Sequence, residues 1–124
     1  MILPLRVRDV RDMVDGAARR RGTVTFKQLF SVFPEHTPAS DVYDTLEKAC
    51  LELGPPSEVI YSAVLAKKGD GLPGDGFFDM FMTHRPEEYR QIAAETKTLE
   101  LTDEQRLKIT NMERERIYAH ASVQ

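Results

Sequence analysis

The stretch that decides the expected fold is residues 59–82, which read VIYSAVLAKKGDGLPGDGFFDMFM. Its first third, residues 59–66, is rich in β-branched and aromatic residues, which is typical of a strand. Its last third, residues 77–82, is rich in phenylalanine and predicts a second strand. The segment between them, 67–76, holds four of the seven glycines of the chain. Together the three parts predict a β-hairpin with a long tip.

Upstream of this hairpin, apolar residues recur at steps of three and four, as they do along one face of a helix. This spacing predicts helices over 6–21, 27–33 and 38–53. A short β-branched run at 23–26 separates the first two helices and predicts a short strand. Gly22 is expected to cap the end of the first helix, and Thr37 the start of the third.

Two further helices are expected after the hairpin. Pro86, followed by two glutamates, suits the first turn of one helix, which Leu99 and its neighbours would end. Thr102 and Gln105 have the spacing of a capping box, which predicts a last helix over 103–120. The apolar residues of this last helix do not form one stripe. It therefore either packs irregularly or contacts the core on one side and a partner on the other.

The order helix, short strand, two helices and β-hairpin is that of a winged helix. We therefore expect an α+β, mostly helical fold with a winged-helix-like core over residues 5–83 and two added C-terminal helices over 84–124. A chain of 124 residues has the size of one domain, so residues 1–124 are expected to form a single unit. The strand at 23–26 would pair with the hairpin, and the loop at 67–76 would be the wing.

The second strand of the expected hairpin is apolar on both faces. Phe77 and Phe81 would lie on one face, and Phe78, Met80 and Met82 on the other. A hairpin strand that is buried on one side usually alternates apolar with polar residues. The second face therefore needs a cover, either from the C-terminal helices or from a partner, and we favour the helices.

The net charge of −3 comes from 17 basic and 20 acidic residues. This balance argues against a strongly basic nucleic-acid wrapper and against a polyanionic DNA mimic. The charge is nevertheless uneven: it is +4 over residues 1–34, −6 over 35–84 and −1 over 85–124. The candidate residues for a partner are the basic side chains of the first helix and of the wing, with three apolar residues of the hairpin: Arg6, Arg8, Arg11, Arg19, Arg20, Arg21, Lys67, Lys68, Leu72, Phe77 and Phe81. The alternative interpretation of the arginines is a solvated helix face whose last turn matches the helix dipole.

The third helix would be the recognition helix of a winged helix, and it is acidic. Asp41, Asp44, Glu47 and Glu52 outnumber its single Lys48. Acidic side chains repel the phosphate backbone, and helices that read bases usually carry Arg, Lys, Asn or Gln. We therefore expect an anionic partner to meet the first helix or the wing rather than this helix.

The glycine-rich loop does not fit three known patterns of ligand-binding loops. Gly69, Gly71 and Gly74 have the spacing of the dinucleotide fingerprint, but that fingerprint needs a helix after the glycines, and a strand is expected there. Asp75 stands where a Walker loop needs lysine. The aspartates also lack the spacing of a calcium loop. We expect no cofactor and no metal at this loop.

No catalytic arrangement follows from the other reactive residues. Cys50 lies on the apolar stripe of the third helix and is expected to be a buried structural thiol. It is the only cysteine, so the chain forms no internal disulfide, which fits a cytoplasmic protein. His36, His84 and His120 are far apart in the sequence and lack ligand spacing. No signal peptide or membrane span is expected, because no apolar run approaches about 20 residues.

Two segments carry a resemblance. TVTFKQLF at 23–30 and KKGDGLPGDGFF at 67–78 together resemble small, largely uncharacterised bacterial winged-helix-like proteins with a K-x-G-x-G-L-P-G-x-G-F-F hairpin. Some of these proteins are associated with mobile-element or restriction-type neighbourhoods. The likeness covers residues 5–82 and carries over no catalytic or binding residues. The acidic third helix departs from DNA-binding winged helices.

These observations lead to one expected function and two alternatives. We expect a small non-enzymatic module that acts by association with a protein or nucleic-acid partner, or with a second copy of itself. The alternative is a DNA-binding transcriptional regulator. An enzyme of unknown class is a more distant alternative.

Overall fold

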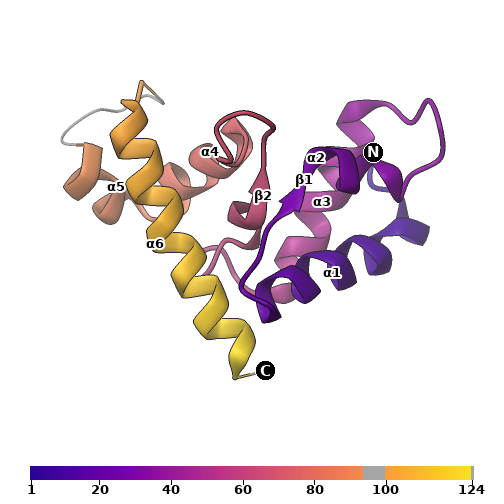
Figure 1. Cartoon of the computed structure of the whole chain (residues 1–124), viewed down its shortest axis with the longest axis horizontal. Coiled ribbons are helices and arrows are strands. Elements are labelled where there is room, and N and C mark those ends of the chain that lie inside the picture. The colour runs from indigo at the N-terminus through magenta and orange to yellow at the C-terminus, as the bar shows by residue number, and fades with distance from the viewer. Residues whose placement is uncertain (94–99, 124) are drawn as a thin grey trace.

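The computed structural model describes residues 1–93 and 100–123 and has helices around one small sheet (Figure 1). The helices are α1 (Pro4–Arg19), α2 (Phe26–Ser31), α3 (Ala39–Leu53), α4 (Asp75–His84), α5 (Pro86–Ala93) and α6 (Asp103–Ser122). The strands are β1 (Val24–Thr25) and β2 (Leu65–Ala66), and a 3-10 helix, η1 (Tyr61–Val64), leads into β2. This architecture confirms the expected α+β, mostly helical class.

The first three helices lie where the apolar spacing placed them, but their ends differ from the expected caps. Arg21, not Gly22, has a positive φ of 57° after α1, and the Gly22 N–H donates to the carbonyl oxygen of Ala17 at 2.8 Å. No side chain caps α3, because the Thr37 hydroxyl donates to the carbonyl oxygen of Pro34 at 2.6 Å. Both predicted caps were therefore wrong in detail.

Capping boxes begin two of the helices. Thr102 and Gln105 form the expected one, with backbone-to-side-chain bonds of 2.9 and 3.1 Å at the start of α6. Thr25 and Gln28 form a second one at the start of α2, which was not expected from the sequence. The end predicted for the preceding helix, at Leu99, falls on residues 94–99, which lie outside the described residues.

The expected hairpin is wrong. Residues 77–82 belong to α4, which buries Phe77, Phe78 and Phe81 on one face and leaves Asp79 exposed. Positions i, i+1 and i+4 share a helix face, so a short phenylalanine-rich run fits a helix as well as a strand. The apolar residues on both faces of the expected strand were the sign of this ambiguity. Only the last two residues of 59–66 form a strand, because residues 61–64 turn into η1.

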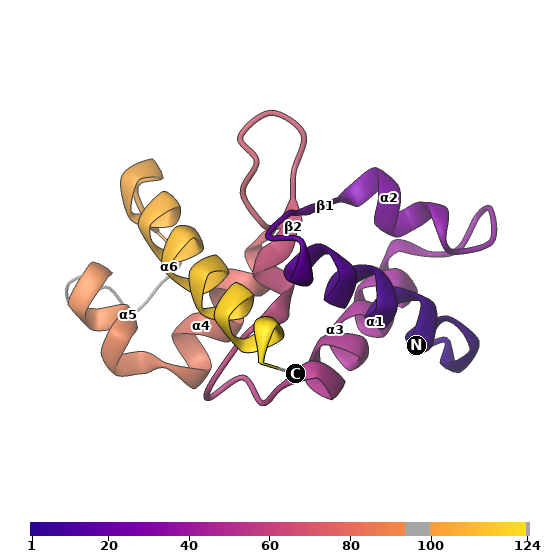
Figure 2. The ribbon, with the colours of Figure 1, turned by 60° about the horizontal axis from the view of Figure 1, so that its bottom comes forward.

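The two strands pair in parallel, with Val24 opposite Leu65 and Thr25 opposite Ala66. The 23–26 segment was expected to pair with the hairpin; it pairs only with the end of the 59–66 run, because the second expected strand is part of α4. Parallel neighbours need a crossover connection, and α2 and α3 supply it. The glycine-rich loop is therefore not a hairpin tip; it joins β2 to α4 and projects beside β2 (Figure 2).

Buried side chains from Val7 to Ala121 form one core cluster, so the C-terminal helices share the core of the N-terminal ones. Helix α6 packs against α1 and η1 (Figure 1). Its buried face runs at steps of four through Ile109, Glu113, Ile117 and Ala121, with Thr110 and Tyr118 beside it. The helix therefore does have one packing stripe, which the sequence hid because two of its members are polar. Among the described residues, no helix combines the length and the apolar character needed to cross a membrane.

Candidate partner-binding site

Acidic side chains lie beside most of the basic side chains at the front of the sequence. Four arginines of α1 lie within 4 Å of a carboxylate: Arg6 with Asp9, Arg8 with Asp12, Arg11 with Glu52 and Arg19 with Asp15. The Arg11 pair joins α1 to α3, with 2.7 Å between Nη1 and Oε1. Exposed pairs of this kind contribute little stability, but each one places a negative charge beside the positive one. Each of these four candidate arginines therefore has an acidic side chain beside it.

The two arginines after α1 differ from each other. Arg21 donates twice to Glu115 of α6, at 2.9 and 2.7 Å, and its guanidinium lies 5.0 Å from the centre of the Tyr118 ring. Arg20 is exposed, and in the described part of the chain no carboxylate lies within 4 Å of it. Most of the predicted basic patch is therefore engaged within the chain itself.

The candidate residues of the glycine-rich loop and of α4 differ in whether they are exposed, ion-paired or buried. Lys67 lies 3.5 Å from Asp70, and Lys68 is exposed. Leu72 and Phe81 are buried in the chain's own interior, at 7% and 1% exposure, so neither is presented to a partner. Phe77 is buried as well, but its side chain lines a groove.

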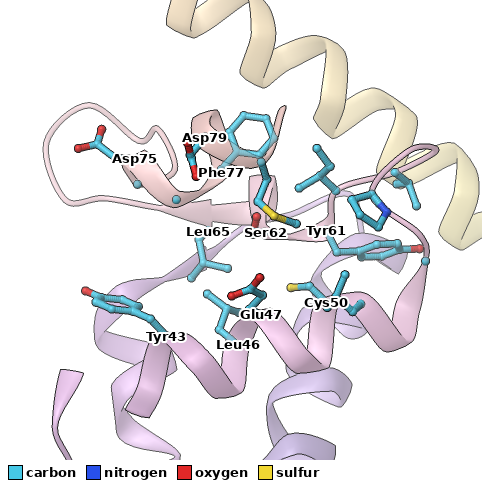
Figure 3. Close-up of a pocket in the computed structure, with 18 of the residues that line it drawn as sticks. Tyr43, Leu46, Glu47, Cys50, Tyr61, Ser62, Leu65, Asp75, Phe77 and Asp79 are labelled. Carbon is cyan, nitrogen blue, oxygen red and sulfur yellow. The ribbon is translucent and has the colours of Figure 1, made fainter. Parts of the chain in front are cut away.

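This groove has a volume of about 550 Å³ and lies between α3 and the start of α4, with η1 and β2 behind it (Figure 3). Leu46 and Cys50 line it from α3, and Leu65 and Phe77 line it from the other side. Its size falls in the range of sites that hold small molecules or inserted side chains. It brings together residues that are 31 positions apart in the sequence, from Leu46 to Phe77.

An aromatic wall closes one end of the groove. The ring of Tyr43, on α3, meets Phe26 and Phe30 of α2 edge to face, with centroid distances of 6.3 and 5.8 Å. Such contacts hold an aromatic side chain in place. Tyr43 nevertheless remains 47% exposed, so part of its ring is free for a further contact.

The mouth of the groove is acidic. Glu47 lies on the α3 side, and Asp75 and Asp79 lie on the α4 side (Figure 3). Asp75 is 3.8 Å from the Arg106 guanidinium, whereas no ion-pair partner lies within 4 Å of Glu47 or Asp79 among the described residues. Lys67 is the single base that lines the groove in the described part of the chain, and it has Asp70 beside it.

Two titratable side chains, Cys50 and Tyr61, line the groove beside its apolar residues. Cys50 is buried as expected, and burial together with the charge of Glu47 raises the pKa of its thiol to about 12. The thiol therefore stays protonated near neutral pH and is a poor nucleophile. The Tyr61 hydroxyl lies 2.6 Å from Nδ1 of His120, and burial raises the Tyr61 pKa to about 12.

The glycine-rich loop is followed by a helix after all, so the reason given above for rejecting the dinucleotide fingerprint was wrong. Two other features still speak against phosphate at the start of α4. Asp75 places a carboxylate in the first turn, where the anion would bind, and Pro73 has no N–H to donate. The preceding strand, β2, is also only two residues long.

Helix α6 holds the segments that form the back of the groove. Arg114 donates from Nε to the carbonyl oxygen of Ala63 at 2.7 Å, and from Nη2 to those of Leu65 and Gly71 at 3.0 and 2.8 Å. Glu113 accepts the N–H of Ile60 at 2.7 Å. These residues were not singled out in the sequence, because charged residues in a helix usually face solvent. The only local sign was the gap they left in the apolar stripe of α6.

Comparison of the chain with protein-family models, with curated proteins and with solved structures gives no match. Within residues 1–93 and 100–123, no three His, Cys, Asp or Glu side chains lie close enough together to hold a metal ion.

Proposed function

We propose that the chain is a small non-enzymatic module that acts by binding a partner protein. The order helix, strand, two helices and strand over residues 4–66 resembles that of a winged helix up to the hairpin, which does not form here, and we place α3 in the position of the recognition helix by this likeness. One observation carries the proposal: α3 borders an open apolar groove with an acidic mouth, where a DNA reader would carry basic and amide side chains.

The charges around α3 argue against the alternative, a DNA-binding transcriptional regulator. Glu47 is exposed on α3 and would repel phosphates, whereas Asp44 on the same helix pairs with the N-terminal ammonium group at 2.6 Å. The arginines of α1 offer little compensation, because acids lie beside most of them. Of the basic candidate residues, Arg20 and Lys68 are those with no carboxylate within 4 Å in the described part of the chain.

The apolar side chains at the groove favour a protein as the partner. Tyr43 and Leu51 line the groove and are exposed by 47% and 44%. Exposed apolar surface with a polar rim is the usual anatomy of a protein interface, and tyrosine is enriched in such interfaces. A second copy of the chain belongs to the same class of partner as a different protein.

Site-specific crosslinking tests this function. A photoreactive residue is placed at Leu51, at the groove, and in a matched variant at Leu107, which is 50% exposed on α6. We expect a protein adduct from position 51 in the cells that make the chain, absent from position 107 and lost when Tyr43→Asp is added. Sedimentation of the full chain then shows whether the adduct is a second copy.

A duplex-binding measurement tests the alternative. We expect no binding of a DNA duplex at low salt. Duplex binding with a steep negative salt slope that flattens in the Arg19→Ala, Arg20→Ala, Arg21→Ala variant would instead establish a nucleic-acid function and overturn the proposal.

A further inference from the structure

We propose that the groove between α3 and α4 binds an apolar segment of the partner that is flanked by lysine or arginine residues. This inference rests on the proposed function and adds the chemistry of the partner. It combines three properties of the groove, which are its apolar interior, its acidic mouth and its exposed aromatic wall. Each property selects a different feature of the occupant.

The interior selects for apolar side chains. Leu46, Leu65 and Phe77 face the cavity, and the polar groups beside them are the buried thiol of Cys50 and the hydroxyl group of Ser62 (Figure 3). A volume of about 550 Å³ exceeds what one aliphatic side chain fills, so a segment with several apolar residues fits better than a single anchor.

The mouth selects for positive charge. Glu47 lies on one side of the opening and Asp79 on the other, and neither has an ion-pair partner within 4 Å among the described residues. A cationic residue on either flank of a bound segment would meet one of these carboxylates. An anionic occupant, such as a fatty acid or an acidic peptide, would be repelled by both.

The aromatic wall adds to the same preference. The ring of Tyr43 is held by Phe26 and Phe30 and is half exposed. An exposed tyrosine face attracts a lysine or arginine side chain by a cation–π contact. Positive charge is therefore favoured at the end of the groove as well as along its mouth.

The back of the groove is fixed before a partner arrives. Arg114 holds the carbonyl groups of Leu65 and Gly71, and Glu113 holds the N–H of Ile60. A preformed site loses less conformational entropy on binding than a flexible one. The groove is thus suited to direct docking of a short segment.

Three labelled peptides of equal length test the proposal with the full chain. The first has Leu and Phe along one helix face and Lys elsewhere, the second has Glu in place of each Lys, and the third has the composition of the first in a scrambled order without an apolar face. We expect the first peptide to bind, measured by fluorescence anisotropy, and the other two to bind at least about ten-fold more weakly.

Reversing the charge at the mouth of the groove tests the same charge preference from the side of the protein. The double variant Glu47→Lys, Asp79→Lys should lower the affinity for the Lys peptide by about ten-fold and raise the affinity for the Glu peptide. The reason is that the charge at the mouth of the groove changes sign. Glu35→Lys, which reverses an exposed acid in the α2–α3 connection, is the control and should change neither affinity by more than about two-fold. Circular dichroism and thermal melting establish that all variants fold.

Three outcomes would overturn this inference. They are equal binding of the Lys and Glu peptides, equal binding of the scrambled peptide, and failure of the Lys peptide to bind at all. If crosslinking from Leu51 still yields a protein in any of these cases, the proposed function stands and only the chemistry of the occupant is wrong. Duplex binding would remove the proposed function itself.

Discussion

Arg85 and Glu113 form a two-point ion pair in the interior, across 28 residues of sequence. Arg85 Nη1 donates to Glu113 Oε1 at 2.7 Å, and Nη2 contacts Oε2. Glu113 is fully buried, and Arg85 is 7% exposed. The carboxylate also accepts the N–H of Ile60 and an N–H of Arg116, so four donors surround it. The pair joins Arg85, which follows the last residue of α4, to the middle of α6.

Removing the charge of Glu113 should destabilise the chain strongly. In Glu113→Gln the guanidinium of Arg85 stays buried and loses its two-point partner, keeping only the carboxylate of Glu88 at 3.9 Å, which costs about 3–5 kcal/mol. Urea unfolding measures the loss. Glu115→Gln is the matched control, because Glu115 pairs with Arg21 at the surface and its loss should cost less than about 1 kcal/mol. Equal effects of the two changes would show that the buried pair has no special role.

Arg114 should be irreplaceable by lysine. One ammonium group lacks the geometry to reach the carbonyl oxygens of Ala63, Leu65 and Gly71 together. We expect Arg114→Lys to lose about 1.5–3 kcal/mol of unfolding free energy. Hydrogen exchange should also become faster at the amides of Lys67 and Gly71.

The matched change for Arg114 is Arg8→Lys. Arg8 is exposed and 3.9 Å from Asp12, so its replacement should stay within about 0.5 kcal/mol of the parent chain. If both lysine variants leave exchange in the loop unchanged, the loop is held by something other than α6.

Gly54 should not tolerate a side chain. Its φ is extended, at 175°, so the restriction is steric: an added Cβ would overlap Cγ1 of Val59. Gly54→Ala is expected to cost about 1–3 kcal/mol, measured by chemical unfolding. The cost should shrink when Val59→Ala is also present, because that change removes the clashing methyl group.

Gly76→Ala provides the control for Gly54→Ala. No atom lies within 4 Å of an added Cβ at Gly76, which sits in the first turn of α4. This change should be neutral or stabilise the chain by up to about 1 kcal/mol, since alanine favours helix over glycine. Destabilisation by both changes would contradict the steric argument.

The thiol of Cys50 should be unreactive in the folded chain. Because its pKa is raised to about 12, almost no thiolate exists at about pH 8, and a thiol reagent should react only after unfolding. Rapid reaction of the native protein would contradict the burial of this side chain. The readout is the rate of colour release from a disulfide reagent with and without denaturant.

The same shift predicts how stability depends on pH. The folded chain keeps the Cys50 proton up to about pH 12, whereas the unfolded chain loses it near pH 9. The folded state therefore holds more protons in this window, and the unfolding free energy should fall as the pH rises from about 9 toward 12. Cys50→Ala should make this fall shallower, as measured by urea unfolding at several pH values.

Local patterns in the sequence were sufficient for much of the N-terminal half. The step of three and four between Val42, Leu46, Ala49 and Leu53 predicted α3, and the same spacing predicted α1. It also placed Cys50 in the interior, because a residue on the apolar face of a helix is buried by whatever packs there. The Thr102–Gln105 capping box, formed by neighbours three residues apart, was likewise predicted.

The secondary structure of apolar runs shorter than two helical turns depended on tertiary contacts rather than on the local sequence. Phe77, Phe78 and Phe81 suit one face of a helix, but the same run also has the composition of a buried strand. The partners of this run, α5 and Arg106 of α6 over the Phe78 ring, lie outside the run itself, so the local pattern did not distinguish the two structures.

The sequence by itself determined the helices with regular apolar spacing, the Thr102–Gln105 capping box and the burial of Cys50. All of these depend on neighbours along the chain or on a simple alternation. Only the tertiary structure decided that Glu113 is buried, that acids lie beside the arginines of α1, and that α2, α3, β2 and α4 enclose a groove with an acidic mouth. The physical reason is that a charged side chain is placed by its partner, and Arg85 lies 28 residues away from Glu113 along the chain.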